Sequence, residues 1–164
     1  TCPWISLVES SVRMEDKALK EEAYYAIQQP DYITIIAQTF SGKLPIVRQY
    51  RPAVDAFTLE LPAGILEKGE SPENAARREL MEETGVEASE VVFLGSFYAD
   101  TGRLSNQQHV YFMRGSDPKP DFEREKGIEV LFRTKAELLK EIKTGTFKHQ
   151  LHVGAFFLAI DLLG

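Results

Sequence analysis

Short apolar stretches separated by turn-forming residues predict a chain that is rich in β-strands. Runs of four to eight residues that alternate, or that are apolar throughout, fit half-buried or fully buried strands. We expect strands at residues 4–12, 24–28, 32–39, 44–50, 91–98, 108–114 and 128–133. Proline, glycine or clustered charges mark loops, which we expect at residues 52–57, 100–106 and 116–127.

One segment in the middle of the chain carries both a helix start signal and a helix stop signal. Ser71 is a good N-cap, and Pro72 suits the first helical position, where a missing N–H costs nothing. Gly85 can end the helix in a left-handed conformation. The sequence therefore predicts a helix of about three and a half turns that begins at Pro72.

Two further helices are expected near the C-terminus. Thr134 with Glu137 forms a capping box that predicts a helix over residues 135–143. The apolar stretch at residues 151–163 predicts the last helix. Strands interrupted by helices in this order favour an α/β fold, in which a mixed sheet carries helices on both sides.

The helix that begins at Pro72 places three carboxylates together. Glu79 and Glu83 are four residues apart on one face, and Glu82 lies beside them. Like charges at these spacings cost a helix roughly 0.2–0.5 kcal/mol per pair. A hard divalent cation turns that repulsion into affinity, and oxygen ligands favour Mg²⁺ or Mn²⁺. The spacing therefore predicts a divalent metal site that holds a phosphate.

Arg78 lies within reach of the same carboxylates. It precedes Glu82 by four residues and is adjacent to Glu79. An arginine here can pair with a glutamate of the helix or reach back to Glu70 in the preceding loop.

Composition narrows the classes of function. The chain has 164 residues, which suits a single domain over residues 1–164, and 43% of them are hydrophobic. A net charge of −6 without a basic run argues against nucleic acid as a partner. The longest apolar stretch is too short to cross a bilayer, and no signal peptide is recognisable. The single cysteine, Cys2, fits a reducing cytoplasm.

The spacing of residues 64–86 is that of the Nudix box, so the chain is identified as a member of the Nudix hydrolase family. All nine defined positions match: Gly64, Glu70, Arg78, Glu79, Leu80, Glu82, Glu83, Gly85 and Val86. A chance match in a chain of this length is on the order of 10⁻⁷. The resemblance implies the Nudix α/β/α sandwich with a mixed sheet, and adds N-terminal antiparallel strands.

The resemblance also assigns roles to residues of the box. The metal ligands it implies are the backbone carbonyl of Ala63 and the carboxylates of Glu79 and Glu83. Glu82 is expected to be either a further ligand or a base beside the ligands. Arg78 and Glu70 are expected to orient the carboxylates rather than bind substrate.

Residues around the box resemble the ADP-ribose pyrophosphatase branch of the family. Arg51-Pro52 and the run Glu60-Leu61-Pro62-Ala63-Gly64 carry the likeness. It implies hydrolysis of ADP-ribose to AMP and ribose 5-phosphate, with Arg51 on the phosphate or adenine end. It also implies a homodimer with the strands of residues 1–40 in the interface, and an aromatic that stacks on adenine. Trp4, Tyr24 and Tyr25 are the candidates.

Downstream of the box the chain departs from that branch. Thr101 stands where a proline is usual before Gly102, and Asn106 stands where a glutamate is usual. Gly102 is retained as a candidate substrate contact. The catalytic base outside the box is expected in the late loop, where Glu125 and Glu123 are the candidates.

Several alternatives remain open at this stage. The substrate could be another nucleotide sugar, a dinucleoside polyphosphate or an oxidised nucleotide. A Nudix domain can also bind a nucleotide ligand without hydrolysing it. His109, His149 and His152 lack a third nitrogen or sulfur ligand at matching spacing, so we interpret them as surface or core residues.

Overall fold

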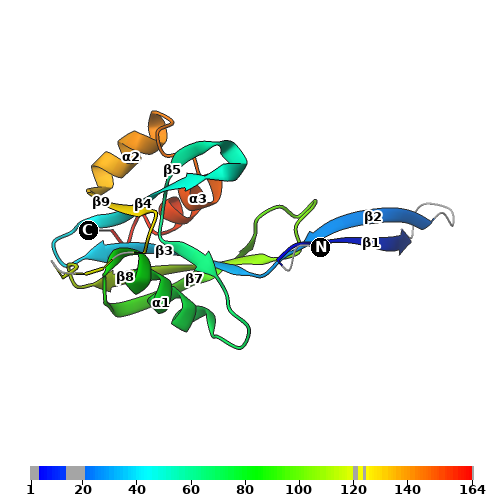
Figure 1. The fold of residues 1–164 in the computed structure, drawn as a ribbon, viewed down its shortest axis with the longest axis horizontal. Coiled ribbons are helices and arrows are strands. Elements are labelled where there is room, and N and C mark those ends of the chain that lie inside the picture. Colours follow the sequence, from blue (N-terminus) through cyan, green and yellow to red (C-terminus); the bar gives the residue numbers. More distant parts are fainter. Residues whose placement is uncertain (1–3, 14–20, 120–121, 124, 164) are drawn as a thin grey trace.

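The computed structural model describes residues 4–13, 21–119, 122–123 and 125–163 (Figure 1). Its elements are mostly strands, with one α-helix in the middle of the chain and two near the C-terminus, as the sequence predicts. In chain order they are β1 (Ser6–Arg13), β2 (Glu21–Gln28), β3 (Tyr32–Thr39), β4 (Leu44–Arg51), the 3-10 helix η1 (Pro52–Val54), β5 (Ala56–Glu60), β6 (Ala63–Ile65), α1 (Pro72–Thr84), β7 (Ala88–Tyr98), β8 (Gln107–Gly115), β9 (Ile128–Arg133), α2 (Lys135–Lys143) and α3 (Gln150–Leu158).

The strands of the body form two sheets that are enclosed by helices. One sheet has the order β6-β3-β8-β7, and the other has the order β5-β4-β9. Strands β3 and β8 run parallel, whereas the remaining pairs are antiparallel, so the first sheet is mixed. Helix α1 lies on one side of the sheets, and α2 and α3 lie on the opposite side (Figure 1). The predicted α/β sandwich with a mixed sheet is confirmed.

Strand β3 separates two hydrophobic cores. Ile33 and Ile35 face α1, where they pack with Leu80 and Met113. On the other face, Ile36 packs into a larger core with residues of β4, β8, α2 and α3. Since a strand that is covered on both faces buries nearly every side chain, the continuous burial of residues 33–39 reflects this central place.

The ends of α1 follow the signals in the sequence. The Ser71 side chain accepts a hydrogen bond from the Asn74 N–H at 3.3 Å, and Pro72 is the first helical residue. Gly85 has φ 72° and donates its N–H to the Met81 carbonyl at 2.9 Å. Both caps fix the rotation of the helix, and therefore the direction in which its glutamates point.

Strands β1 and β2 form an antiparallel hairpin that projects beyond the body of the molecule (Figure 1). Large apolar side chains of this segment lie exposed: Trp4, Ile5, Leu7, Val12, Tyr24 and Tyr25. Strand β7 exposes a second apolar group, which consists of Val92, Phe93, Phe97 and Tyr98.

The expectation of a loop at residues 52–57 was wrong. The chain forms η1, passes through Asp55 at φ 50° and enters β5 at Ala56. Phe57 lies opposite Tyr50 on β4, and the two ring centroids are 5.6 Å apart. Pairing with β4 therefore continues where Pro52 indicated a break.

The last helix is shorter than the apolar stretch that predicted it. Helix α3 ends at Leu158 rather than at residue 163. Beyond it, the Lys135 ammonium group donates to the carbonyls of Ile160 and Leu163 at 2.9 and 3.0 Å, which gives partners to two carbonyls of the chain end. No helix in the described ranges is both long enough and apolar enough to cross a membrane.

Candidate active site

Three glutamates accept hydrogen bonds from Arg78 of α1. The guanidinium group donates to Glu70 at 3.1 and 3.0 Å, to Glu79 at 2.7 Å and to Glu82 at 3.2 Å. Glu83 completes the group, which we call the carboxylate cluster (Glu70, Glu79, Glu82 and Glu83). A planar arginine with five N–H donors can hold several carboxylates in fixed directions. The sequence predicted that Arg78 could pair with a glutamate of the helix or with Glu70, and the structure shows both contacts.

Gly64 allows one member of the cluster to approach the backbone. A Cβ atom at residue 64 would lie 2.0 Å from the Glu79 carboxyl carbon and 2.1 Å from its Oε1. Such contacts are far inside the van der Waals limit, so only glycine leaves room for the carboxylate here. The first glycine of the box therefore positions Glu79 directly against β6.

The strand residue before Gly64 contacts a second member of the cluster. The Ala63 N–H donates to the Glu83 carboxylate at 3.1 Å. Pro62 faces β3 instead, because its carbonyl accepts from the Ile35 N–H at 2.8 Å. Successive residues of a strand direct their polar groups to opposite sides. The Ala63 carbonyl therefore points away from β3, toward α1, on the same side as its N–H.

Negative charge in the carboxylate cluster exceeds the charge of its arginine. The pKa of Glu83 is raised to about 8, chiefly by burial; the Ala63 N–H lowers it, and the charges of Glu79 and Glu125 raise it. Burial also raises the pKa of Glu79 despite its contact with Arg78. A divalent cation would relieve this repulsion, so these residues fit a metal ion on chemical grounds.

The late loop brings two more glutamates to the cluster. Glu123 and Glu125 line a groove of about 380 Å³ together with Glu82, Met81 and Phe122. Glu125 also contributes to the raised pKa of Glu79 and Glu83, so its charge faces the centre of the cluster. Both predicted base candidates therefore lie beside the box helix, although they are far from it in sequence.

A larger cavity adjoins the cluster on the side of the N-terminal segment. It measures about 1030 Å³, and Trp4, Asp31, Glu70 and Glu79 are among its lining residues. We call it the Trp4 cavity. Trp4, a candidate for stacking on adenine, and Glu79, a predicted metal ligand, therefore line the same cavity.

The other substrate candidates lie elsewhere. The Tyr24 hydroxyl donates to the Gly102 carbonyl at 2.8 Å, so the structure joins these two residues to each other. Tyr25 is 53% exposed on the hairpin. Asn106 is buried, and its Oδ1 accepts from the Gln29 side chain at 3.1 Å. None of these residues lines the Trp4 cavity.

Arg51 makes an ion pair that the sequence did not indicate. Its guanidinium group donates to both oxygens of Glu60, at 2.8 and 2.7 Å, and Thr58 donates to the same carboxylate at 2.6 Å. Burial alone would raise the pKa of Glu60, but Arg51 and Thr58 outweigh it and lower the pKa to about 2. The position of Glu60 between Leu59 and Leu61 was the available signal, because a charge inside an apolar strand needs a partner.

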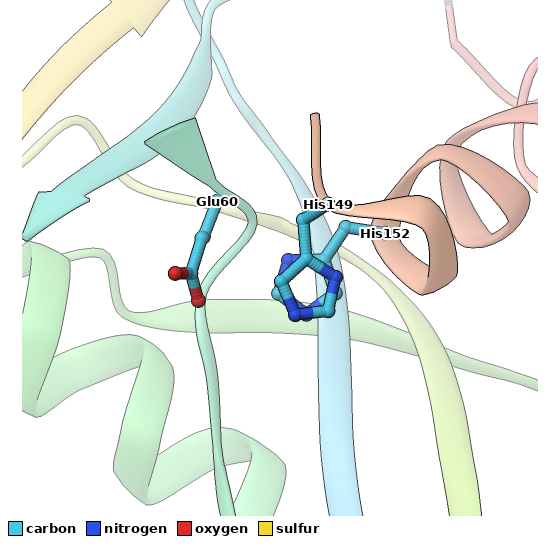
Figure 2. A group of neighbouring side chains, drawn as sticks. All are labelled: Glu60, His149 and His152. Atoms are coloured by element: carbon cyan, nitrogen blue, oxygen red, sulfur yellow. The ribbon is translucent and has the colours of Figure 1, made fainter. Parts of the chain in front are cut away.

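Two histidines stack beside this ion pair (Figure 2). The rings of His149 and His152 have centroids 3.6 Å apart and an angle of 16° between their planes. His152 is buried, and its Nδ1 accepts the Leu61 N–H at 3.1 Å. Burial lowers the pKa of His152 to about 3, so the ring is neutral near pH 7. His152 is thus a core histidine, one of the two interpretations that the sequence left open.

Glu60, His149 and His152 do not fit a metal ion, although one possible ligand atom of each lies within 4.8 Å of the others. Both oxygens of Glu60 already accept hydrogen bonds from Arg51. The lone pairs of the two stacked imidazoles lie in nearly parallel planes, whereas two ligands of one ion must converge on it. The positive charge of Arg51 would also repel a cation. The two histidines instead pack by ring stacking, and His152 joins α3 to the end of β5 through its hydrogen bond with the Leu61 N–H.

Fold and site together define a hydrolase of the Nudix type. Residues 29–151 match the NUDIX domain family, and the chain belongs to this family. The ADP-ribose pyrophosphatase of Bacillus subtilis is 33% identical to it over 131 residues. The ADP-sugar pyrophosphatase of Mus musculus is 35% identical over 124 residues, and the methanol dehydrogenase activator of Bacillus methanolicus is 34% identical over 120 residues.

The aligned parts are shorter than the relatives themselves. They cover 78% of this chain and 69% of the Bacillus subtilis protein, and 71% of this chain and 57% of the mouse protein. For the Bacillus methanolicus protein the shares are 71% and 65%. A crystal structure of an ADP compounds hydrolase superposes with a TM-score of 0.79 at 18% identity, over 99% of this chain and 88% of that one. The predicted family and class of enzyme, a Nudix diphosphate hydrolase, are confirmed.

Proposed function

We propose that the protein hydrolyses ADP-ribose to AMP and ribose 5-phosphate with Mg²⁺ as its metal ion. The observation that carries the proposal is the carboxylate cluster, whose negative charge is only partly balanced by Arg78. Pyrophosphatases of ADP-ribose and ADP-sugars among the relatives support the substrate. Mn²⁺ would suit the same oxygen ligands.

Glu79, Glu83 and the carbonyl of Ala63 would hold the metal ions. When bound, these ions neutralise the diphosphate and lower the pKa of the attacking water. Glu82 is exposed at the edge of the cluster and serves either as a further ligand or as a base. Arg78 and Glu70 keep the carboxylates in place, as their bidentate contact indicates.

Glu125 is the better candidate for the base outside the box, with Glu123 as the alternative. Its negative charge raises the pKa of Glu79 and Glu83, which supports a position close to these proposed metal ligands. A base there can take a proton from a water molecule that attacks the phosphorus. Glu123 lines the same groove but is not among the main causes of the pKa shift of either proposed ligand.

Arg51 would contact a phosphate of the substrate, and Trp4 would stack on the adenine. The Arg51 side chain is 45% exposed, and its charge lowers the pKa of Glu83, which supports a place next to the ligands. Trp4 is exposed and lines the same cavity as Glu79. Tyr24, Tyr25 and Gly102 would contribute from the projecting hairpin and its neighbouring loop.

A homodimer would cover the apolar surface of the hairpin and of β7. Exposed groups of this size on a small protein favour an interface with another chain. Light scattering at micromolar concentration should give twice the mass of the chain. A monomer under these conditions would remove both the dimer and any aromatic contributed across it.

The experiment that tests the proposal is phosphate release from a panel of nucleotide derivatives in Mg²⁺ or Mn²⁺, with a coupled phosphatase. ADP-ribose is compared with ADP-glucose, GDP-mannose, diadenosine polyphosphates and oxidised dGTP. Preference for ADP-ribose supports the proposal. Preference for another compound would assign specificity to the altered loop at Thr101 and Asn106. Tight binding of ADP-ribose without metal-dependent hydrolysis would indicate a domain that senses nucleotides instead.

A further inference from the structure

Asp31 places a carboxylate in the Trp4 cavity, outside the Nudix box. It follows β2, and its own carbonyl accepts the Leu66 N–H at 2.9 Å. The cavity extends from this residue to Trp4 and to Glu79. Since the side chain is 36% exposed, it is open to a molecule that enters the cavity.

Hydrogen bonds fix the orientation of this carboxylate. One oxygen accepts the Gln107 N–H at 2.7 Å, and the other lies 3.3 Å from Nε2 of His109. The second nitrogen of His109, Nδ1, lies 2.7 Å from the Ser96 hydroxyl. Because a carboxylate can only accept, Nε2 must carry a proton, and in the neutral ring Nδ1 then accepts from Ser96. The chain Ser96–His109–Asp31 thus holds the carboxylate in place, as packing and neighbouring hydrogen bonds do in preorganised sites.

The negative charge of the Trp4 cavity limits the ligand groups that Asp31 can bind. Glu67, Glu70 and Glu79 also line it, and Lys68 is the single cation among its described lining residues. A phosphate next to Asp31 would be repelled, whereas a neutral hydroxyl would donate a hydrogen bond to it. A carboxylate with two fixed contacts still has lone pairs for such donors.

A nucleoside diphosphate derivative carries such hydroxyls on the ribose that joins its base to its diphosphate. A diphosphate at Glu79 and a base on Trp4 would bring the sugar between them into the cavity that Asp31 also lines. We propose that Asp31 is a specificity residue that accepts hydrogen bonds from the hydroxyls of a ribose. The proposal rests on the proposed function, because it takes the diphosphate to be held at the carboxylate cluster.

Both riboses of ADP-ribose have hydroxyls that could donate to Asp31. Binding of analogues that lack one hydroxyl shows which ribose does so. The probes are α,β-methylene ADP-ribose, which resists hydrolysis, and two versions that lack the 2-hydroxyl of the nucleoside ribose or of the terminal ribose. Dissociation constants are measured by calorimetry in Mg²⁺. We expect the wild-type protein to bind one of the two deoxy analogues roughly 10-fold to 100-fold more weakly, since hydrogen bonds to charged groups have about this strength.

Variants of two acidic residues in the Trp4 cavity distinguish a hydrogen bond to the ribose from a general effect of negative charge. In Asp31→Asn, the penalty for the missing hydroxyl should fall to within about threefold, because the charged acceptor is gone. Glu67→Gln removes an equal charge from an exposed residue of the same cavity and should keep the full penalty. Ser96→Ala releases only the far end of the chain and should lower the penalty partway. Melting curves check that each variant is folded.

Two results would overturn the proposal. One is a wild-type protein that binds ADP-ribose and both deoxy analogues equally. The other is a folded Asp31→Asn variant that keeps the full penalty. These are binding measurements, so they fail or succeed separately from hydrolysis of ADP-ribose, which is followed by phosphate release.

Discussion

Two buried glutamates of this protein differ in the direction of their pKa shifts. Glu60 is 1% exposed and its pKa is lowered to about 2, whereas Glu83 is 5% exposed and its pKa is raised to about 8. Burial raises the pKa of both. The difference comes from their neighbours. Glu60 has an arginine on both oxygens, while Glu83 has one backbone N–H and two other carboxylates nearby.

The opposite shifts distinguish a buried carboxylate that is paired with an arginine from one that has no such partner. Arg51 compensates the charge of Glu60 within the protein, so this part of the site needs no ion. In the carboxylate cluster Arg78 pairs with three of the four glutamates. Burial and the neighbouring carboxylates keep the pKa of Glu83 at about 8 despite the charge of Arg51, so a cation that binds there must replace a proton. Exposure alone does not distinguish the two, because both carboxylates are almost inaccessible.

The largest effect is expected for Glu83→Gln. The substitution keeps the shape of the side chain but removes a charge from the proposed metal site, so turnover in saturating Mg²⁺ should fall by at least about 100-fold. Glu73→Gln alters an exposed glutamate of the same helix and should leave turnover unchanged. Near wild-type turnover of Glu83→Gln would show that the metal assignment is wrong.

Arg78→Ala should weaken metal binding without removing a ligand. Glu70, Glu79 and Glu82 would lose the group that fixes their directions, so Mg²⁺ affinity should fall by about 10-fold to 100-fold. The neighbouring Arg77 pairs with Glu73 on the exposed side of the helix, and Arg77→Ala is the matched control. Equal Mg²⁺ titrations for the two variants would contradict the orienting role.

At the Arg51–Glu60 ion pair, the substitution Arg51→Ala should reduce the free energy of unfolding. Glu60 would be left buried and without its partner, at a cost of about 1–3 kcal/mol, a modest figure because Arg51 itself is nearly half exposed. For a chain of this size the melting temperature should drop by roughly 2–10 °C. Arg48→Ala breaks an exposed pair with Glu129 and should change stability by less than about 1 kcal/mol.

A smaller loss is expected when the histidine beside this pair is replaced. His152→Leu leaves the Leu61 N–H buried without an acceptor, which should cost about 1–2 kcal/mol in urea unfolding. His152→Asn offers a side-chain oxygen in place of Nδ1 and should recover part of the loss. If the leucine variant unfolds at the same urea concentration as the wild type, the hydrogen bond contributes nothing to stability.

Much of the carboxylate cluster could be predicted because its signals are local. The caps at Ser71 and Gly85 lie next to the helix that they end, and the spacing of Glu79 and Glu83 alone places them on one face. Gly64 and Arg78 also belong to the same short segment, so its sequence contains nearly all of the geometry.

The Arg51–Glu60 pair could not be predicted in the same way, because long-range pairing creates it. Strand β5 forms only when Phe57 and its neighbours pair with β4, and Pro52 had indicated a loop instead. His152 reaches Leu61 from α3, which lies 91 residues further along the chain. Nor does the sequence show that the Trp4 cavity joins Asp31 to Glu79.

The two glutamates also respond to pH in opposite senses. Glu60 has a pKa below its ordinary 4.5, so it stabilises the fold above that pH, and the contribution is lost as pH falls through about 2. Glu83 has a pKa above 4.5, so its folded state prefers the protonated form. Without metal, stability should therefore decline as pH rises from 4.5 to about 8.

The most direct measurement is Mg²⁺ affinity as a function of pH, by calorimetry on the wild type and on Glu83→Gln. A cation must displace the proton of Glu83, so wild-type affinity should rise by up to about tenfold per pH unit below pH 8 and level off above it. Glu83→Gln should bind weakly, with a shallower dependence on pH. Wild-type affinity that stays constant between pH 6 and pH 9 would contradict a metal site built on an uncompensated, buried Glu83.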